Sequence, residues 1–205
     1  AKEKEVVKNE KRQRVDNRPY GHVFDVISTN LYPASHSYSW LPIGSLEDLQ
    51  AATLQDVKDF YTQWYVPNNT TLVISGDFDP KQTRQWVEKY FKDIPKGPEV
   101  PKQVKRKVTL EETKKFYHED KFATLPQLTR VWRTPEKFHP DAYVIDILIK
   151  LLVDSKDAPL YKELVKKQKL TSAVQLFDYR SELASELFLM VTAFEGVDLD
   201  SVHKA

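Results

Sequence analysis

A proline-rich break near the middle of the chain limits what it can fold into. Pro95, Gly97, Pro98 and Pro101 stand close together and are flanked by lysines. A stretch of this composition neither continues a helix nor pairs centrally in a sheet, so it favours an extended spacer. We therefore predict two segments, residues 1–96 and 105–205, joined by a linker at residues 97–104.

Hydrophobic spacing in the first segment is mostly helical. Ser45, Thr53 and Asp79 each stand where a side-chain oxygen can cap a helix N-terminus, with Pro80 at the first helical position. A short β-rich run at 70–76 follows a Pro-Asn-Asn turn and predicts a buried strand. The helices that we expect lie at 2–15, 22–31, 54–65 and 81–91, with a short one after Ser45.

The second segment alternates between strand-like and helical runs. Strands are predicted at 105–110, 115–119, 128–134, 172–179 and 186–194, and helices at 141–153 and 158–167. Strands and helices in this order favour an α+β fold. We expect a two-layer arrangement in which a mostly antiparallel sheet carries helices packed on one face.

Composition excludes several classes of function. Thirty-one basic and thirty acidic residues give a net charge of +1, which predicts no nucleic-acid partner. The chain has no cysteine, so it can form neither disulfides nor thiolate metal sites. Its longest apolar-leaning run, 143–153, is far below the roughly 20 residues of a membrane span. The chain begins without Met and without a visible signal peptide, and we interpret it as a piece of a longer protein.

Metal-ligating residues are sparse. Glu3 and Glu10 are seven residues apart on a predicted helix and therefore share nearly one face. Such a face could offer one carboxylate to a metal and place another behind it, although a solvated charged helix explains the same spacing. No two histidines stand at the i, i+4 spacing of a zinc-binding pair. His36 lies in an aromatic loop, where a hydrogen-bonding role is the simpler interpretation.

One recognisable pattern is a helix that leads through a Pro-Asn-Asn turn into a run ending in Gly-Asp, at 53–61 and 65–79. Further distinctive stretches lie at 3–10, 17–21, 42–45, 158–165 and 170–174. Together these stretches resemble the pitrilysin-type (insulinase-type) zinc metallopeptidases and their mitochondrial-processing-peptidase-like relatives. By this resemblance, residues 1–96 are the C-terminal half of the first, catalytic-type repeat. Residues 105–205 are the N-terminal half of a second, inactive repeat.

The resemblance implies a Zn²⁺ ion in the intact protein, with Glu10 as its third ligand and Glu3 as a supporting residue. The family's His-x-x-Glu-His motif is absent from the sequence and would lie in an upstream half. In some relatives the inactive repeat also carries an Arg and a Tyr that reach the substrate. The aligned positions here hold Val165 and Ser172. We therefore expect the chain alone to bind no metal, to contain no catalytic residue and to be inactive.

In the intact protein the chain would form a wall of the chamber that encloses a peptide substrate, with the upstream half as its partner. Two alternatives stay open: a non-catalytic scaffold or core subunit of the same fold, and a generic α+β binding module. The two halves could also complement each other as one permuted pseudo-domain or as a domain-swapped homodimer. Bacterial relatives of this type favour a periplasmic or otherwise exported location.

Overall fold

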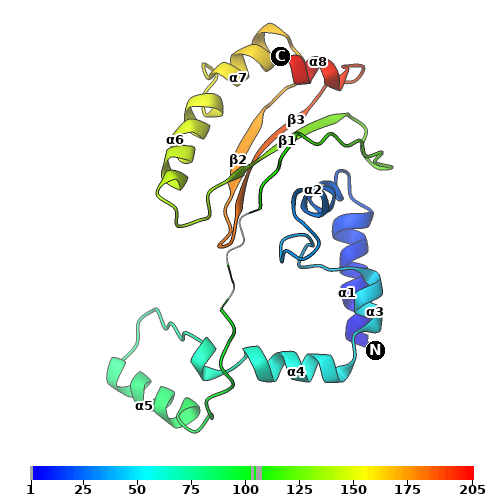
Figure 1. Ribbon diagram of the computed structural model, residues 1–205. Helices are drawn as coiled ribbons and strands as arrows, with labels where there is room; N and C mark the ends of the chain where they lie inside the picture. Colours follow the sequence, from blue (N-terminus) through cyan, green and yellow to red (C-terminus); the bar gives the residue numbers. More distant parts are fainter. Residues whose placement is uncertain (1, 103, 105–107) are drawn as a thin grey trace. The chain divides into compact units, whose positions relative to one another are not determined.

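The computed structural model describes residues 2–102, 104 and 108–205 (Figure 1). The chain divides into two compact units, one made of Ala1–Gly44 with Val104–Ala205, and the other of Ser45–Gln103. The larger unit is therefore built from two stretches that are separated in sequence. None of the described helices is both long enough and apolar enough to cross a lipid bilayer.

A three-stranded antiparallel sheet organises the larger unit. Its strands β1 (Gln127–Thr134), β2 (Gln175–Tyr179) and β3 (Ser185–Thr192) are ordered β1-β3-β2. Gln127 pairs with Thr192 and Thr134 with Ser185 along β1 and β3, and Phe177 faces Phe188 across β2 and β3. These are the predicted strands near 128–134, 172–179 and 186–194, so the α+β class with an antiparallel sheet is confirmed.

One face of this sheet packs against helices that follow β1 in sequence. The core there contains Leu164, Val191, Ala193 and Val202, surrounded by half-buried leucines and valines. Leu164 comes from η3 (Lys162–Lys167), which continues α7 (Pro159–Tyr161), and Val202 comes from α8 (Leu199–Lys204). The helix α6 (Asp141–Val153) contacts β2. The short helix α8 was not predicted, because its apolar pattern is shorter than two turns.

The other face of the sheet is contacted by residues from the N-terminal stretch. Helix α1 (Lys2–Lys11) continues into the π-helical turn η1 (Arg12–Asp16), and α2 (Val23–Leu31) follows it. The ring of Phe24 lies 5.4 Å from that of Phe188, which stacks on Phe177 at 5.2 Å. Leu31, Tyr32 and Ala184 form a second small core beside Val131.

The smaller unit consists of helices whose caps were predicted correctly. It contains α3 (Leu46–Ala51), α4 (Leu54–Trp64), η2 (Pro67–Asn69) and α5 (Pro80–Phe91). The Ser45 hydroxyl accepts from the Asp48 amide, and Thr53 with Asp56 forms a complete capping box. The Asp79 carboxylate accepts from the Gln82 amide at 2.7 Å. Each cap satisfies amides that the first helical turn leaves without a partner.

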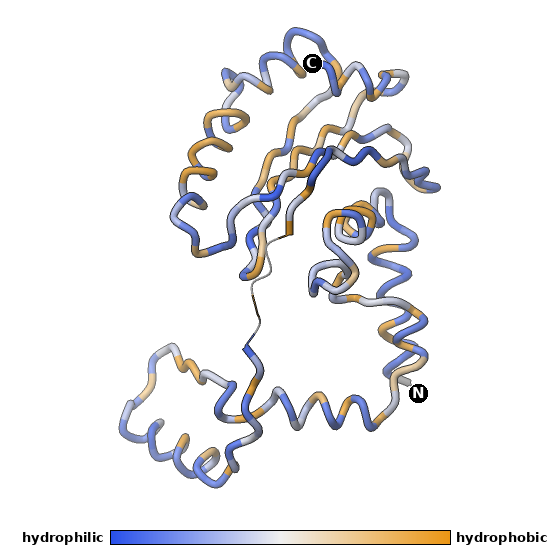
Figure 2. Tube along the Cα trace, viewed as in Figure 1, coloured by the Kyte–Doolittle hydropathy of each residue, from blue (hydrophilic) through white to orange (hydrophobic). Residues whose placement is uncertain are grey.

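Burial in the smaller unit differs from the prediction. Helices α4 and α5 carry hydrophobic residues among hydrophilic ones (Figure 2). Their apolar side chains are exposed, with Phe60 at 58% and Trp86 at 54%. Residues 70–76 form no strand, and Val73 is 79% exposed. The prediction of a buried strand there was wrong, because a strand needs a hydrogen-bonded neighbour and the described part of the chain supplies none.

Two further predicted strands are also absent. Residues 108–110 and 115–119 have no strand pairing, and 105–107 lie outside the described residues. Each run combines β-forming residues with charged ones, such as Val108 and Thr109 in the first and Phe116 and Tyr117 in the second. Residue preference alone cannot provide a neighbouring strand, and the described sheet ends at β1 and β2.

Candidate functional site

The two acidic residues singled out by the sequence both lie on α1. Glu3 is exposed, and the Oε1 atom of Glu10 lies 3.2 Å from Nη1 of Arg14, one turn along the chain. The Glu10 side chain is 40% exposed, and its ion pair with Arg14 is a surface contact. The Glu10 carboxylate is therefore partly exposed to solvent.

The residues present do not fit a complete zinc site. No group of three His, Asp or Glu side chains in the described ranges is arranged to hold a metal ion. A catalytic zinc site takes three protein ligands, of which Glu10 could be at most one. Any metal chemistry would therefore need donors from outside the residues described.

The His36 ring has a structural environment. It is 4% exposed, stacks on Tyr32 with ring centres 4.6 Å apart, and lies edge-on to Tyr38 at 5.2 Å. Its Nδ1 accepts a hydrogen bond from the Tyr38 amide at 3.1 Å. This geometry agrees with the hydrogen-bonding role that its loop position favoured.

The Pro-Asn-Asn turn fastens the start of the proline-rich stretch. The Asn68 amide group donates to the Pro98 carbonyl at 3.0 Å, and its Oδ1 accepts from the Gly97 amide at 2.9 Å. A Cβ atom added to Gly97 would lie 2.1 Å from Cγ1 of Val66, so only glycine permits this approach. Asn69 donates to the Trp64 carbonyl at 2.9 Å and closes the end of α4. The motif therefore has a structural role within the smaller unit.

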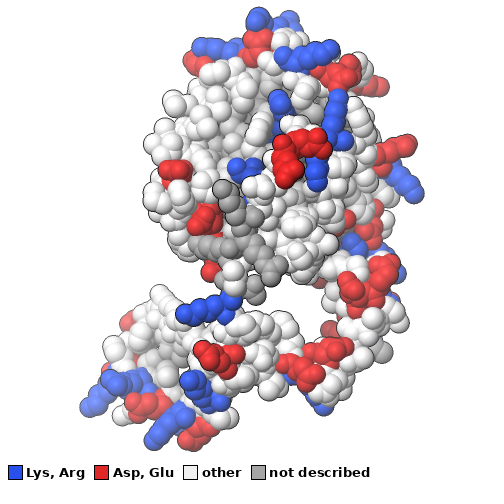
Figure 3. Space-filling model, viewed as in Figure 1, with Lys and Arg blue, Asp and Glu red and all other residues white. Residues whose placement is uncertain are grey.

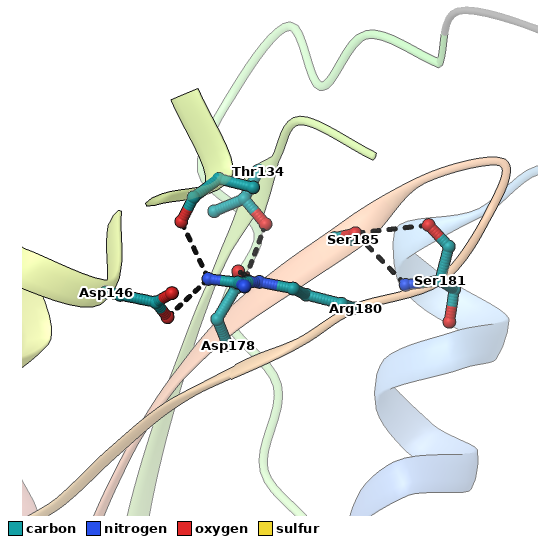
Figure 4. Close-up of polar contacts among 7 residues, drawn as sticks. Thr134, Asp146, Asp178, Arg180, Ser181 and Ser185 are labelled. Atoms are coloured by element: carbon teal, nitrogen blue, oxygen red, sulfur yellow. Dashed lines mark hydrogen bonds and ion pairs between the residues drawn. The ribbon is translucent and has the colours of Figure 1, made fainter. Parts of the chain in front are cut away.

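A partly buried polar cluster joins α6 to the sheet, and no residue spacing in the sequence predicts it (Figure 4). Arg180 donates through Nε to Asp178 at 2.8 Å and through Nη2 to Asp146 on α6 and to the Ala142 carbonyl. The Asp178 side chain is 2% exposed and also accepts from Thr134 at 2.8 Å. Hydrogen bonds from Arg180 to Asp178 and then Asp146 raise the arginine pKa, which keeps the guanidinium charged.

This arrangement links α6 to the sheet through the Arg180 guanidinium, which pairs with a carboxylate on each element. Asp146 was a usable signal, because a carboxylate within an apolar helix needs a cationic partner. Its partner lies 34 residues away in sequence, and spacing does not reveal such a contact.

Comparison with known proteins places the chain. The model for the family described as "Peptidase M16 inactive domain" matches residues 51–203. The chain belongs to the M16 peptidase family. This confirms the family that the sequence resembled, and the part shown is its inactive domain.

The M16 relatives of this chain are described as zinc proteases. "Zinc protease PqqE" of Helicobacter pylori is 29% identical over 192 residues, covering 92% of this chain and 43% of that protein. "Probable zinc protease PqqL" of Escherichia coli is 32% identical over 54 residues, covering 26% of this chain and 6% of that protein. The chain therefore spans less than half the length of these relatives.

Solved structures agree on the M16 fold. A crystal structure of a protease from Helicobacter pylori superposes with a TM-score of 0.77 at 26% identity, covering 98% of this chain and 49% of that one. A Pseudomonas fluorescens structure described as a peptidase M16 inactive domain gives a TM-score of 0.72 at 14% identity, covering 98% of this chain and 49% of that one. The match to the family model crosses the proline-rich stretch. The assignment of residues 1–96 and 105–205 to two repeats stays a prediction.

Val165 and Ser172 are the positions that the family resemblance aligns with the Arg and Tyr of some relatives. Val165 lies in η3 and is half-buried, and Ser172 is exposed beside Thr171, which bridges to Ala193. Neither residue can supply a cation or a phenol to a substrate. On the face shown in Figure 3, acidic and basic side chains are interspersed, so that view shows no single-sign patch.

Proposed function

We propose that this M16 inactive domain is part of a zinc metalloendopeptidase that hydrolyses peptides or unfolded proteins. In that protein the chain would be a wall of the substrate chamber and a scaffold. The proposal is supported by the match to the inactive-domain model over residues 51–203 and by relatives described as zinc proteases. The observation that carries it is the likeness to "Zinc protease PqqE", which extends over 92% of this chain at 29% identity. Glu10 is a partly exposed carboxylate and no three donors are arranged for a metal among the described residues, so we expect the chain alone to be inactive.

In this proposal Glu10 is the third zinc ligand and Glu3 supports it, with the two imidazole donors on an upstream half that carries His-x-x-Glu-His. The exposed apolar side chains of the smaller unit support a partner of this kind. Leu72, Ile74, Phe78, Trp86 and Tyr90 line an open groove of about 340 Å³. A surface of this composition is costly in water and is normally covered in an assembled protein.

Zinc titration tests the proposal. The 205-residue chain, titrated with Zn²⁺ against a chromophoric chelator, is expected to bind no stoichiometric metal. The same chain joined to an upstream half with His-x-x-Glu-His should bind one Zn²⁺ and cleave an unfolded substrate, and Glu10→Gln should weaken metal binding at least tenfold. Glu5→Gln on the same helix is the matched control and should leave zinc affinity unchanged. Stoichiometric zinc on the chain alone would contradict the proposal.

The alternative is a non-catalytic scaffold or core subunit of the same fold, which the inactive-domain description also supports. It predicts that the joined protein binds substrate without zinc and without cleavage. An exported protein is our proposal for location, supported by the E. coli structure described as the periplasmic protease PqqL, which shares the fold at a TM-score of 0.71. A permuted pseudo-domain or a swapped homodimer remains a proposal that sedimentation of the purified chain can test.

A further inference from the structure

One buried carboxylate lies where the N-terminal stretch meets the sheet. Glu186 on β3 is 6% exposed and accepts a hydrogen bond from the hydroxyl of Tyr32, the residue that ends α2. The two residues are 154 positions apart in sequence. This contact therefore fastens α2 and the loop after it to the second face of the sheet.

The groups facing Glu186 come from each neighbouring element. Arg133 of β1 and Tyr179 of β2 stand opposite Glu186 in the two strand registers. From the loop, the His36 ring stacks on Tyr32 at 4.6 Å and the Tyr38 ring lies at 5.8 Å from it. The segment after residue 108 contributes charged groups that line a pocket with Leu31 and Pro33, on either side of Tyr32 in sequence. These groups are Glu111, Glu112 and Lys114.

Arg133 is the cation placed to neutralise the Glu186 carboxylate, but its guanidinium lies over the Tyr32 ring instead. Its guanidinium carbon lies 5.8 Å from the centre of the Tyr32 ring. Its buried Nε atom has no hydrogen-bond acceptor among the described residues. The ion pairs of the described residues also include none between Arg133 and Glu186. Glu186 is therefore held by one neutral hydroxyl in an apolar and aromatic setting.

Burial decides how such a carboxylate titrates. Removal from water penalises the charged form and raises the pKa of Glu186 to about 7 from 4.5. Because the folded value is the higher one, the carboxyl stabilises the docked state fully below about pH 4.5. That contribution is lost as the pH rises through about 7. An ionised carboxylate here must draw water or a cation into the contact.

We propose that protonation of Glu186 is a conformational switch: it holds α2 and the loop at 32–39 on the sheet, and loss of the proton releases them. The other face of the sheet is not part of the switch, since its buried carboxylate, Asp178, is paired with the Arg180 guanidinium at 2.8 Å. The link between α1 and α2 is fastened separately. Asp120 accepts from the Tyr20 amide at 2.7 Å, and hydrogen bonds to backbone amides hold the pKa of Asp120 below its usual range. Release should therefore be confined to residues 23–39.

Hydrogen–deuterium exchange of the full 205-residue chain at pH 6 and pH 8 tests the switch, with rates corrected for intrinsic exchange. Linkage between the two pKa values predicts about a tenfold loss of protection for peptides from residues 23–39 between these pH values. Peptides from α6 and α8 should change by less than about twofold. Equal protection at residues 23–39 at both pH values would overturn the proposal.

Isosteric variants assign the titrating group. Glu186→Gln keeps the acceptor for Tyr32 but cannot ionise, so its protection should be independent of pH. Glu182→Gln, on the exposed turn before β3, is the matched control and should keep the tenfold change of the wild type. If Glu186→Gln retained that change, or if His36→Gln abolished it, the switch would be assigned wrongly.

The variant Arg133→Met distinguishes release of residues 23–39 from an exchange of partners, in which ionised Glu186 pairs with Arg133. If ionised Glu186 were captured by Arg133, the wild type would stay protected at pH 8 and only Arg133→Met would lose protection. That outcome would replace release by an exchange of partners and would refute the switch. Loss of protection in both proteins supports it. The wild-type protection should fall between about pH 4.5 and pH 7 and level off above about pH 7, which provides a further check should a variant fail to fold.

Discussion

The two compact units of this chain share good helix signals but differ in what those helices bury. In the larger unit, a three-stranded sheet gives η3 and α8 a surface to cover, so that Leu164 is 3% exposed. In the smaller unit, the better-capped helix α4 exposes its apolar residues, with Leu54 at 71%. Helix formation here is local, whereas burial depends on a sheet that only one unit contains within the described residues.

The largest effect should come from truncating the same side chain in each unit. Leu164→Ala is expected to destabilise the chain by about 2–4 kcal/mol, because it leaves a cavity beside Val191 and Val202. Leu54→Ala should stay within about 0.5 kcal/mol, since that side chain is already in water. Urea unfolding followed by circular dichroism measures both. Comparable losses would mean that the smaller unit is packed in solution.

Removing an ion pair should also cost more stability in the larger unit than in the smaller one. Arg180→Ala is expected to cost about 1–3 kcal/mol, because it leaves the buried Asp178 carboxylate without its charged donor. Arg84→Ala removes an exposed pair with Glu88 on α5 and should cost less than about 0.5 kcal/mol. The same urea experiment reports both values. A cost below about 0.5 kcal/mol for Arg180→Ala would show that the cluster does not hold α6.

Caps act within one helix and should not depend on the unit. Thr53→Ala removes a complete capping box and is expected to destabilise α4 by about 1 kcal/mol. Thr62→Ala, on the exposed face of the same helix, should stabilise it by a few tenths of a kcal/mol, because alanine is the better helix former. Exchange protection of α4 amides distinguishes the two. Equal effects would exclude the cap as the start signal.

The smallest effect on stability should occur in the unpaired segment. Val73 is 79% exposed, so Val73→Thr should change the free energy of unfolding by less than about 0.5 kcal/mol. It should still slow self-association, since an exposed β-rich segment is a template for pairing with another chain. Light scattering on concentrated samples measures that rate. A loss of more than about 1 kcal/mol would show that residues 70–76 are packed in solution.

Some residues of the candidate site could be named from the sequence, and others only from the folded structure. Glu3 and Glu10 could be named from spacing and family resemblance, and the structure places both on α1. Whether Glu10 binds zinc depends on donors that the described residues do not provide. Arg180 and Glu186 could not be named from sequence, because their partners lie 34 and 154 residues away. Only the folded sheet brings those groups together.

The sequence by itself determined the helices other than α8, the caps of α3, α4 and α5, the Pro-Asn-Asn turn and the strands that became β1, β2 and β3. These depend on hydrogen bonds and side-chain spacing within a few residues. The tertiary structure alone decided which apolar faces are buried and why residues 70–76 stay unpaired. It also decided how a stretch from the N-terminus comes to cover Glu186. The physical reason is that burial and strand pairing both require a second surface, which local sequence does not specify.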